Sequence, residues 1–172
     1  MRVLALSLIV AAASIPPLQA QQPSSSIDLP PGVRTLLQAK GDGVQIYTCA
    51  VTQAAAKWVL KAPDAKLLDA SGNTIGSHFA GPTWKLQDGS QVQGELLAAR
   101  PAPEAGSVPW LLLRVKAGTA TGQLADVAFI RRTDTHGGVA PQSGCASPPH
   151  AAKTVQVPYT AAYTFYAAPA QK

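Results

Sequence analysis

The chain has 172 residues and contains 14 Gly, 15 Pro and only 13% charged residues, whereas about 25% charged residues is usual for a soluble domain. This composition argues against a charged helical bundle and against a coiled coil. The hydrophobic fraction of 47% is too high for a disordered chain. The formal net charge of +5 is thinly spread, with Arg131-Arg132 as the only adjacent basic pair, so nucleic acid is not expected as a partner.

The N-terminus has the pattern of a secretory signal peptide. Residues 1–2 supply a short positive region, residues 3–13 are apolar, and residues 18–20 end in Ala20, a small residue of the kind a signal peptidase requires. The apolar run is too short to span a bilayer, and the two prolines at 16–17 interrupt it. We therefore expect cleavage after Ala20, no membrane span, and a periplasmic or extracellular location.

The sequence contains two cysteines, Cys49 and Cys145. In an oxidising compartment they have a single possible intramolecular pairing, so we expect a disulfide between them. Closing so long a loop stabilises a fold by ~4 to 5 kcal/mol in the chain-entropy model. The alternative, a reactive thiol, is disfavoured because Cys49 lies in a strand-like segment without a nearby histidine or basic cluster to activate it.

Short apolar stretches recur along the chain with turn residues between them, which is typical of an all-β protein. We expect one antiparallel sandwich or barrel over residues 28–167, preceded by a flexible lead-in at 21–27 and followed by a C-terminal tail at 168–172. At most one short helix is expected, at residues 32–39, where Pro31 could start it. The predicted strands are 44–51, 58–60, 66–68, 74–79, 83–86, 92–98, 110–115, 124–130 and 155–166.

One hairpin can be predicted in register. A three-residue loop at 87–89, with Gly89 in a left-handed conformation, places Trp84 opposite Val92 and Leu86 opposite Ser90. A two-residue loop would shift the register by one residue and move Trp84 opposite Gln93. We prefer the three-residue loop and expect Asp88 to bond the turn backbone.

Several of these segments together resemble a known family, the secreted domain-of-unknown-function family thirty-four fifty-five, over residues 28–167. The resemblance implies a secreted single domain without an established activity. Some fungal relatives are labelled malate dehydrogenase, but residues 41–43 lead into a predicted strand and lack the third glycine of a dinucleotide-binding turn. The segments that carry the resemblance are 43–49, 76–84, 88–90, 110–113, Ile130, Arg132, 135–141, Cys145, 157–161 and 163–166.

Two segments concentrate the residues that could contact a ligand. Residues 78–84 and 132–138 bring imidazoles, an arginine, a carboxylate and several glycines into a chain that is otherwise poor in charge, and glycine-rich loops let a ligand approach the backbone. They predict a shallow ligand pocket at one end of the sheets. Its expected ligand-binding residues are His78, Trp84, Arg132, Asp134 and His136.

A structural interpretation of the same residues stays open. The glycines then serve turns, and His78 is hydrogen-bonded within the fold. Of Arg131 and Arg132, one is expected to pair with a buried carboxylate or carbonyl while the other faces water, since adjacent strand residues point in opposite directions.

The aromatic residues near the C-terminus offer another candidate surface. Tyr159 and Tyr163 share a strand face with Phe165, while Tyr166 lies on the opposite face. One face could therefore display a tyrosine to solvent, and an exposed aromatic ring suits a sugar or an apolar ligand.

These patterns favour a binding or envelope-interaction module with a small-molecule, glycan or envelope partner. No two histidines are spaced as a metal-ligand pair, so neither a metal nor a cofactor is expected. The alternative is a hydrolase-like or metal-dependent enzyme, which requires His78, Arg132, Asp134 and His136 to converge in one concave site. Whether the protein is an enzyme is left open by the sequence.

Overall fold

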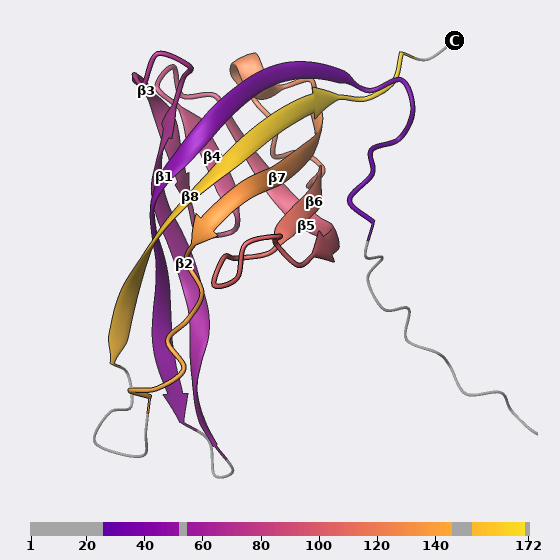
Figure 1. The fold of residues 1–172 in the computed structure, drawn as a ribbon. Helices are drawn as coiled ribbons and strands as arrows, with labels where there is room; N and C mark the ends of the chain where they lie inside the picture. The colour runs from indigo at the N-terminus through magenta and orange to yellow at the C-terminus, as the bar shows by residue number, and fades with distance from the viewer. Residues whose placement is uncertain (1–25, 52–54, 146–152, 171–172) are drawn as a thin grey trace, which may run out of the picture.

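The computed structural model describes residues 26–51, 55–145 and 153–170, and in this part of the chain the protein is an eight-stranded antiparallel barrel (Figure 1). Each strand pairs with the next, and β8 returns to pair with β1, so the sheet closes on itself. The predicted all-β class is confirmed, and the choice between sandwich and barrel is decided in favour of the barrel. The strands are β1 (Arg34–Val51), β2 (Ala56–Leu68), β3 (Thr74–Phe79), β4 (Thr83–Leu86), β5 (Gln91–Arg100), β6 (Trp110–Val115), β7 (Val127–Gly137) and β8 (Thr154–Ala167).

The short helix predicted at residues 32–39 is wrong. The chain turns at residues 31–32, where Gly32 has a φ of 83°, and then enters β1 at Arg34. The first residues of β1 pair with the last residues of β8, beginning with Arg34 opposite Ala167. A helix of eight residues is marginal by itself, so the backbone bonds that close the barrel outweigh the local preference. The structure contains a single 3₁₀ turn within its described residues, η1 (Gly122–Leu124).

The predicted register of the hairpin is confirmed, whereas the bounds of β2 and β7 differ from the predicted ones. Trp84 lies opposite Val92, the Leu86 N–H donates to the Ser90 carbonyl oxygen at 2.8 Å, and Gly89 has a φ of 88°. The predicted strands 58–60 and 66–68 are parts of one long strand, β2. Leu124 belongs to η1, and β7 continues to Gly137, because pairing with β8 carries it well past the predicted end at Ile130.

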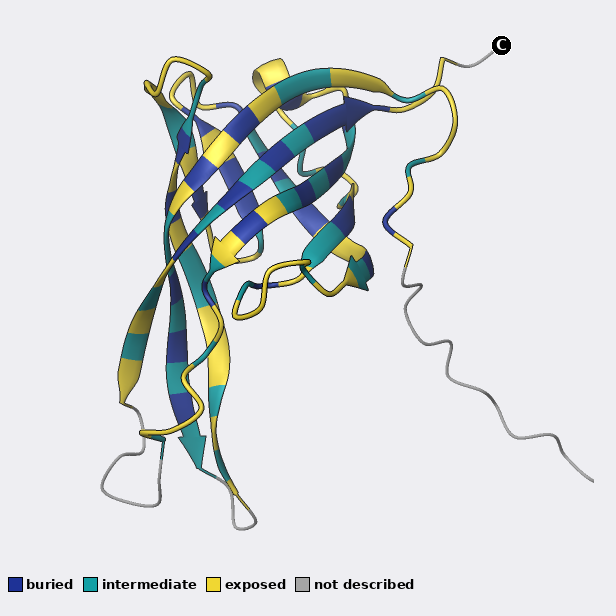
Figure 2. Cartoon of the chain, viewed as in Figure 1, coloured by how far each residue is buried: buried dark blue, intermediate teal, exposed yellow. Residues whose placement is uncertain are grey.

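The barrel interior is filled by side chains that alternate along the strands with exposed ones (Figure 2). Trp84 lies near the middle, with its ring edge-to-face against Tyr163 at 5.5 Å and against Phe165 at 6.1 Å between centroids. Gly41 of β1 leaves the space that Tyr163 occupies, since a Cβ at Gly41 would lie 2.6 Å from Cε2 of that ring. The expected shared face of Tyr159, Tyr163 and Phe165 is therefore the inner face, where all three are buried.

A second apolar cluster lies on the outer side of the barrel wall. Ile27, from the segment that precedes β1, packs with Ala98 of β5 and Leu112 of β6. Three partly buried residues surround them, namely Leu29, Trp110 and Phe129. The chain before β1 thus covers part of the outer wall.

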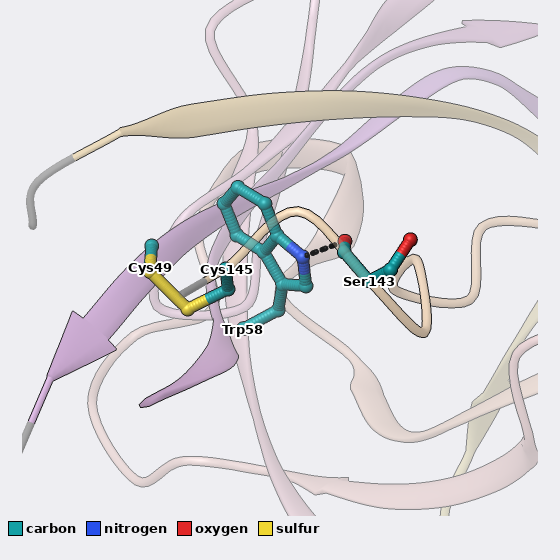
Figure 3. The surroundings of a disulfide bond; sticks show 4 residues. All are labelled: Cys49, Trp58, Ser143 and Cys145. Carbon is teal, nitrogen blue, oxygen red and sulfur yellow. Dashed lines mark hydrogen bonds between the residues drawn. A yellow bond between two sulfur atoms is a disulfide. The ribbon is translucent and has the colours of Figure 1, made fainter. Parts of the chain in front are cut away.

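Strands β1, β2 and β8 extend beyond the barrel as a three-stranded projection, seen at the lower left of Figure 1. A strap of residues 138–145 lies along one of its faces. The Tyr47 hydroxyl donates to the Gly138 carbonyl oxygen at 2.6 Å, and the Trp58 indole N–H donates to the Ser143 carbonyl oxygen at 3.0 Å. Cys49 is bonded to Cys145 (Figure 3), which confirms the predicted disulfide and fixes the end of the strap.

The predicted signal peptide, most of the lead-in and His150 lie outside the described residues. Within the described part of the chain, no helix is long and apolar enough to cross a membrane.

Candidate functional site

Three of the predicted ligand-binding residues lie inside the barrel. The His78 ring stacks on Trp84 with 4.3 Å between centroids and an interplanar angle of 10°, and the edge of Tyr163 meets the His78 ring at 5.1 Å. His78 is 3% exposed, and Arg132 is 9% exposed. We call His78, Trp84, Arg132 and Tyr163 the interior cluster.

His78 is held as a neutral imidazole. Its Nδ1–H donates to the Thr83 carbonyl oxygen at 2.9 Å. The pKa of His78 is lowered to about 4, mainly because burial disfavours the charged ring; the hydrogen bond to Thr83 opposes this effect, and the positive charge of Arg132 adds to it. At neutral pH this histidine is therefore uncharged, and it is shielded from any substrate in solvent.

Arg132 is bound to the segment that closes one end of the barrel. Its Nε and Nη2 donate to the Pro109 carbonyl oxygen at 3.1 and 2.8 Å. Nearby, the Thr135 hydroxyl donates to the Val108 carbonyl oxygen at 2.6 Å, and the Val108 N–H donates to the Gly137 carbonyl oxygen at 2.9 Å. Arg132 thus pairs with a backbone carbonyl oxygen, although Pro109 is an exposed residue. These hydrogen bonds anchor the closing segment.

The other arginine lies against Tyr166. The Arg131 guanidinium is 5.5 Å from the Tyr166 ring centroid, and Tyr166 is itself buried. Tyr166 lies on the outer face, as strand alternation predicts. The expectation that this face displays a tyrosine to solvent is wrong, because the Arg131 side chain packs over the Tyr166 ring.

The interior tyrosines are also uncharged. The hydroxyls of Tyr159 and Tyr163 are 3.3 Å apart. Burial raises the pKa of both groups, and the nearby charge of Arg132 offsets only part of that rise. A phenol that resists ionisation makes a poor general base, so these hydroxyls serve as hydrogen-bonding groups of the core.

Asp134 and His136 lie outside the barrel, because β7 contains a bulge. The pairing of β7 with β8 shifts between Thr133 and His136. Asp134 has a φ of 46° and is the only non-glycine residue in the described segments with a positive φ. Such a conformation costs an L-residue about 1 to 2 kcal/mol. The bulge turns Thr135 inward, where its side chain is buried, and His136 outward, where its side chain is exposed.

The outward side chains next to the bulge form a polar row across three strands. Asp42 of β1 lies opposite Thr160 of β8, which lies opposite His136 of β7. This row separates two shallow hollows of about 320 and 380 Å³ that share His136 and Thr160. We call both hollows together the outer groove, which is lined by Lys40, Asp42, Gly43, Asp134, His136, Gly137, Pro158 and 159–162.

An exposed hydrogen-bonded pair joins the outer groove to a neighbouring loop. His136 Nδ1 is 2.5 Å from Glu104 Oε2, and both side chains are more than half exposed. Glu104 also lines a hollow of about 480 Å³, together with other residues of the segment 99–109 and with Val139. The pair therefore forms a wall shared by the outer groove and this loop hollow.

The five predicted ligand-binding residues thus divide into two groups. The structure brings His78, Trp84 and Arg132 together in the interior, and it places Asp134 and His136 on the outer wall. The four residues of the enzyme alternative do not meet in one concave site, because His78 and Arg132 are buried on the other side of the wall. Among the described residues, no three His, Cys, Asp or Glu side chains lie close enough to hold a metal ion.

The sequence prediction missed four residues of this surface: Lys40, Asp42, Glu104 and Thr160. Lys40 and Asp42 alternate along a strand, so their shared face could have been recognised. The contribution of Thr160 depends on the pairing of β8 with both β7 and β1, and that of Glu104 depends on the loop that lies beside β7. No local pattern signals that contact.

A comparison with known families matches residues 30–167 to DUF3455, described as a protein of unknown function. The chain belongs to this family. The match covers all eight strands of the DUF3455 barrel, including the interior cluster and the outer groove. No curated protein and no solved structure matches the chain.

Proposed function

We propose that this DUF3455 protein is exported and binds a ligand in the outer groove. The observation that carries the proposal is the row of Asp42, Thr160 and His136, which lie in register across three strands beside the strained Asp134. Backbone strain persists where the surrounding structure enforces it, and it clusters at binding sites. Bulges of this kind re-aim side chains next to functional surfaces.

The side chains of the outer groove favour a neutral, hydroxyl-rich ligand such as a glycan. Lys40 Nζ lies 3.9 Å from Asp42 Oδ2, and His136 is paired with Glu104. Lys40 is the one lysine of the groove, and it stands against the carboxylates of Asp42, Asp134 and the neighbouring Glu104, so the groove disfavours a strongly anionic ligand and offers several hydrogen-bond acceptors. Carboxylates accept hydrogen bonds from sugar hydroxyls, while Lys and Thr side chains donate to sugar oxygens.

Export is supported by the leader-like residues 1–20 and by the disulfide between Cys49 and Cys145. Both features fit a periplasmic or extracellular location. Intact-mass measurement of the protein purified from the periplasm, with and without reduction before alkylation, tests this part. We expect a chain that begins at Gln21 and takes up alkyl groups only after reduction, and two freely alkylated thiols would contradict it.

Ligand binding is tested by thermal unfolding with neutral oligosaccharides as probes, followed by calorimetric titration of any probe that stabilises the protein. A ligand at a hundred times its dissociation constant stabilises the native state by about 2.7 kcal/mol. Inorganic phosphate and divalent metal ions serve as charged probes, and the proposal expects no stabilisation from them.

Two variants localise the binding. His136→Ala removes the centre of the polar row, and Arg114→Ala is the matched control, because Arg114 forms an equally exposed ion pair with Glu95 on another part of the wall. We expect His136→Ala to abolish the oligosaccharide response and Arg114→Ala to retain it. Equal loss in both variants, or no response to any oligosaccharide, would contradict binding in the outer groove.

A further inference from the structure

The projection formed by β1, β2 and β8 presents an unpaired strand edge. β2 pairs with β1 along its whole length, from Ala56 opposite Val51 to Leu68 opposite Lys40. On its other side it pairs with β3 only from Ala65 onward. Among the described residues, the second edge of β2 from residue 56 to residue 64 therefore has no strand beside it.

Part of this edge is protected against pairing, and part is open. Between Leu60 and Ala62 the register with β1 shifts by one residue at Lys61, and Pro63 has no N–H to donate. Bulges and prolines are devices that stop a strand from adding to an edge. The open part is residues 56–60, where Val59 is 42% and Leu60 is 52% exposed. We call residues 56–60 the open edge.

We propose that the open edge binds an extended acidic segment of a partner protein, which adds to the sheet as a further strand beside β2. Strand addition of this kind takes its affinity from main-chain hydrogen bonds and its specificity from alternate side chains. The proposal goes beyond glycan binding, because it uses no residue of the outer groove and lies on a different part of the molecule.

Charge identifies an acidic partner and disfavours a second copy of the chain. Lys57 and Lys61 flank the apolar residues 58–60. If two copies paired antiparallel about Val59, Lys57 of one would lie opposite Lys61 of the other, and like charges in direct opposition destabilise a ladder. A strand with acidic residues at these two positions and apolar residues between them has the complementary pattern.

The position of the open edge suits strand addition. It belongs to the projection, away from the closed wall (Figure 1). β3 ends at Phe79, one residue beyond the pairing of His78 with Ala65, so an incoming strand would continue along the line of β3. Phe79 is itself exposed there.

Three synthetic peptides test the proposal with the full mature protein. The first is a fluorescent peptide in which two glutamates flank three valines, and the second has lysine in place of each glutamate. A third peptide repeats the first with alternate backbone amides methylated. We expect fluorescence anisotropy to show binding of the glutamate peptide alone, and hydrogen exchange to slow at residues 56–60 when it binds.

Charge reversal on the protein provides the second arm. The double variant Lys57→Glu with Lys61→Glu is expected to weaken binding of the glutamate peptide at least about ten-fold and to gain binding of the lysine peptide. The control, Lys85→Glu with Lys116→Glu, makes the same change in net charge at exposed lysines outside the open edge, and it should bind as the unmodified protein does.

Four outcomes would overturn the proposal. They are equal binding of the two peptides, undiminished binding of the methylated peptide, no binding of the glutamate peptide, and self-association through the open edge. Vesicles containing phosphatidylglycerol provide a further arm, because lysines beside apolar residues also suit an anionic membrane. Binding to such vesicles without binding to the glutamate peptide would replace the peptide partner with a lipid surface. None of these results depends on whether the outer groove binds a glycan.

Discussion

The two sides of β7 show how one strand serves two different environments. Arg132 points into the barrel and donates two hydrogen bonds to the Pro109 carbonyl oxygen. His136 points outward and pairs with Glu104 in solvent. A buried charged group such as the Arg132 guanidinium is costly without a partner, whereas water can solvate His136 on the outside. The interior cluster therefore contributes to the core, and the outer groove is the part of the surface to which we assign a ligand in our proposal.

The bulge at Asp134 is the structural origin of this difference. Without it, strand alternation would place His136 on the same side as Arg132. The shift in register between Thr133 and His136 reverses the alternation, so His136 joins Asp42 and Thr160 outside. A local departure from regular pairing thus moves a histidine from the core to the surface.

The largest effect is expected from truncating the centre of the interior. Trp84→Ala should lower the free energy of unfolding by about 3 to 5 kcal/mol, because it removes the ring against which His78, Tyr163 and Phe165 pack. Denaturant titration measures the loss. Trp110→Ala on the outer wall, where Trp110 is only partly buried, is the comparison and should cost less. Equal losses of unfolding free energy in the two variants would contradict the distinction between the interior and the outer wall.

Acid should weaken the interior through His78. Its pKa is about 4 in the fold, below its unfolded value of about 6.5. The unfolded chain therefore binds the proton first, and stability present above pH 6.5 is lost as the pH falls towards 4, by about 3 kcal/mol in total. The variant His78→Phe, which keeps a ring on Trp84, should lose this dependence. Unfolding free energies measured across that pH range in both proteins test the prediction, and parallel curves would contradict it.

An intermediate effect is expected at the bulge. Asp134→Val places a β-branched residue at a φ of 46° and should cost about 1 to 2 kcal/mol. Asp134→Gly removes the strain but increases the conformational entropy of the unfolded chain. Its free energy of unfolding should therefore stay within about 1 kcal/mol of that of the unmodified protein. Thermal unfolding of the two variants checks the order. If both cost the same, the left-handed conformation is not the cause.

The smallest effect on stability is expected from removing the His136 side chain, which pairs with Glu104 on the outer wall. His136→Ala should change the free energy of unfolding by less than about 1 kcal/mol, because both partners are more than half exposed. Denaturant titration in parallel with Trp84→Ala completes the comparison. A loss as large as that of Trp84→Ala would make His136 part of the core's support, and it would no longer be a residue available for a ligand.

The candidate site could be predicted in composition but not in arrangement. The concentration of His78, Arg132, Asp134 and His136 in a charge-poor chain predicted one shared pocket, but these residues lie on two sides of the wall. Strand alternation alone cannot reveal a bulge, because a single extra residue reverses every later side chain. The contact of Glu104 with His136 likewise depends on a loop whose position no local pattern specifies.

The sequence by itself determined the all-β class, the pairing of Cys49 with Cys145 and the register of the hairpin that carries Trp84. These features depend on local alternation, on turn residues such as Gly89, and on the presence of two cysteines. The tertiary structure alone decided that the sheet closes into a barrel, that residues 34–39 are a strand, and that His78 and His136 lie on opposite sides of the wall. Closure pairs the first strand with the last, and such long-range pairing outweighs the weak preferences of short segments.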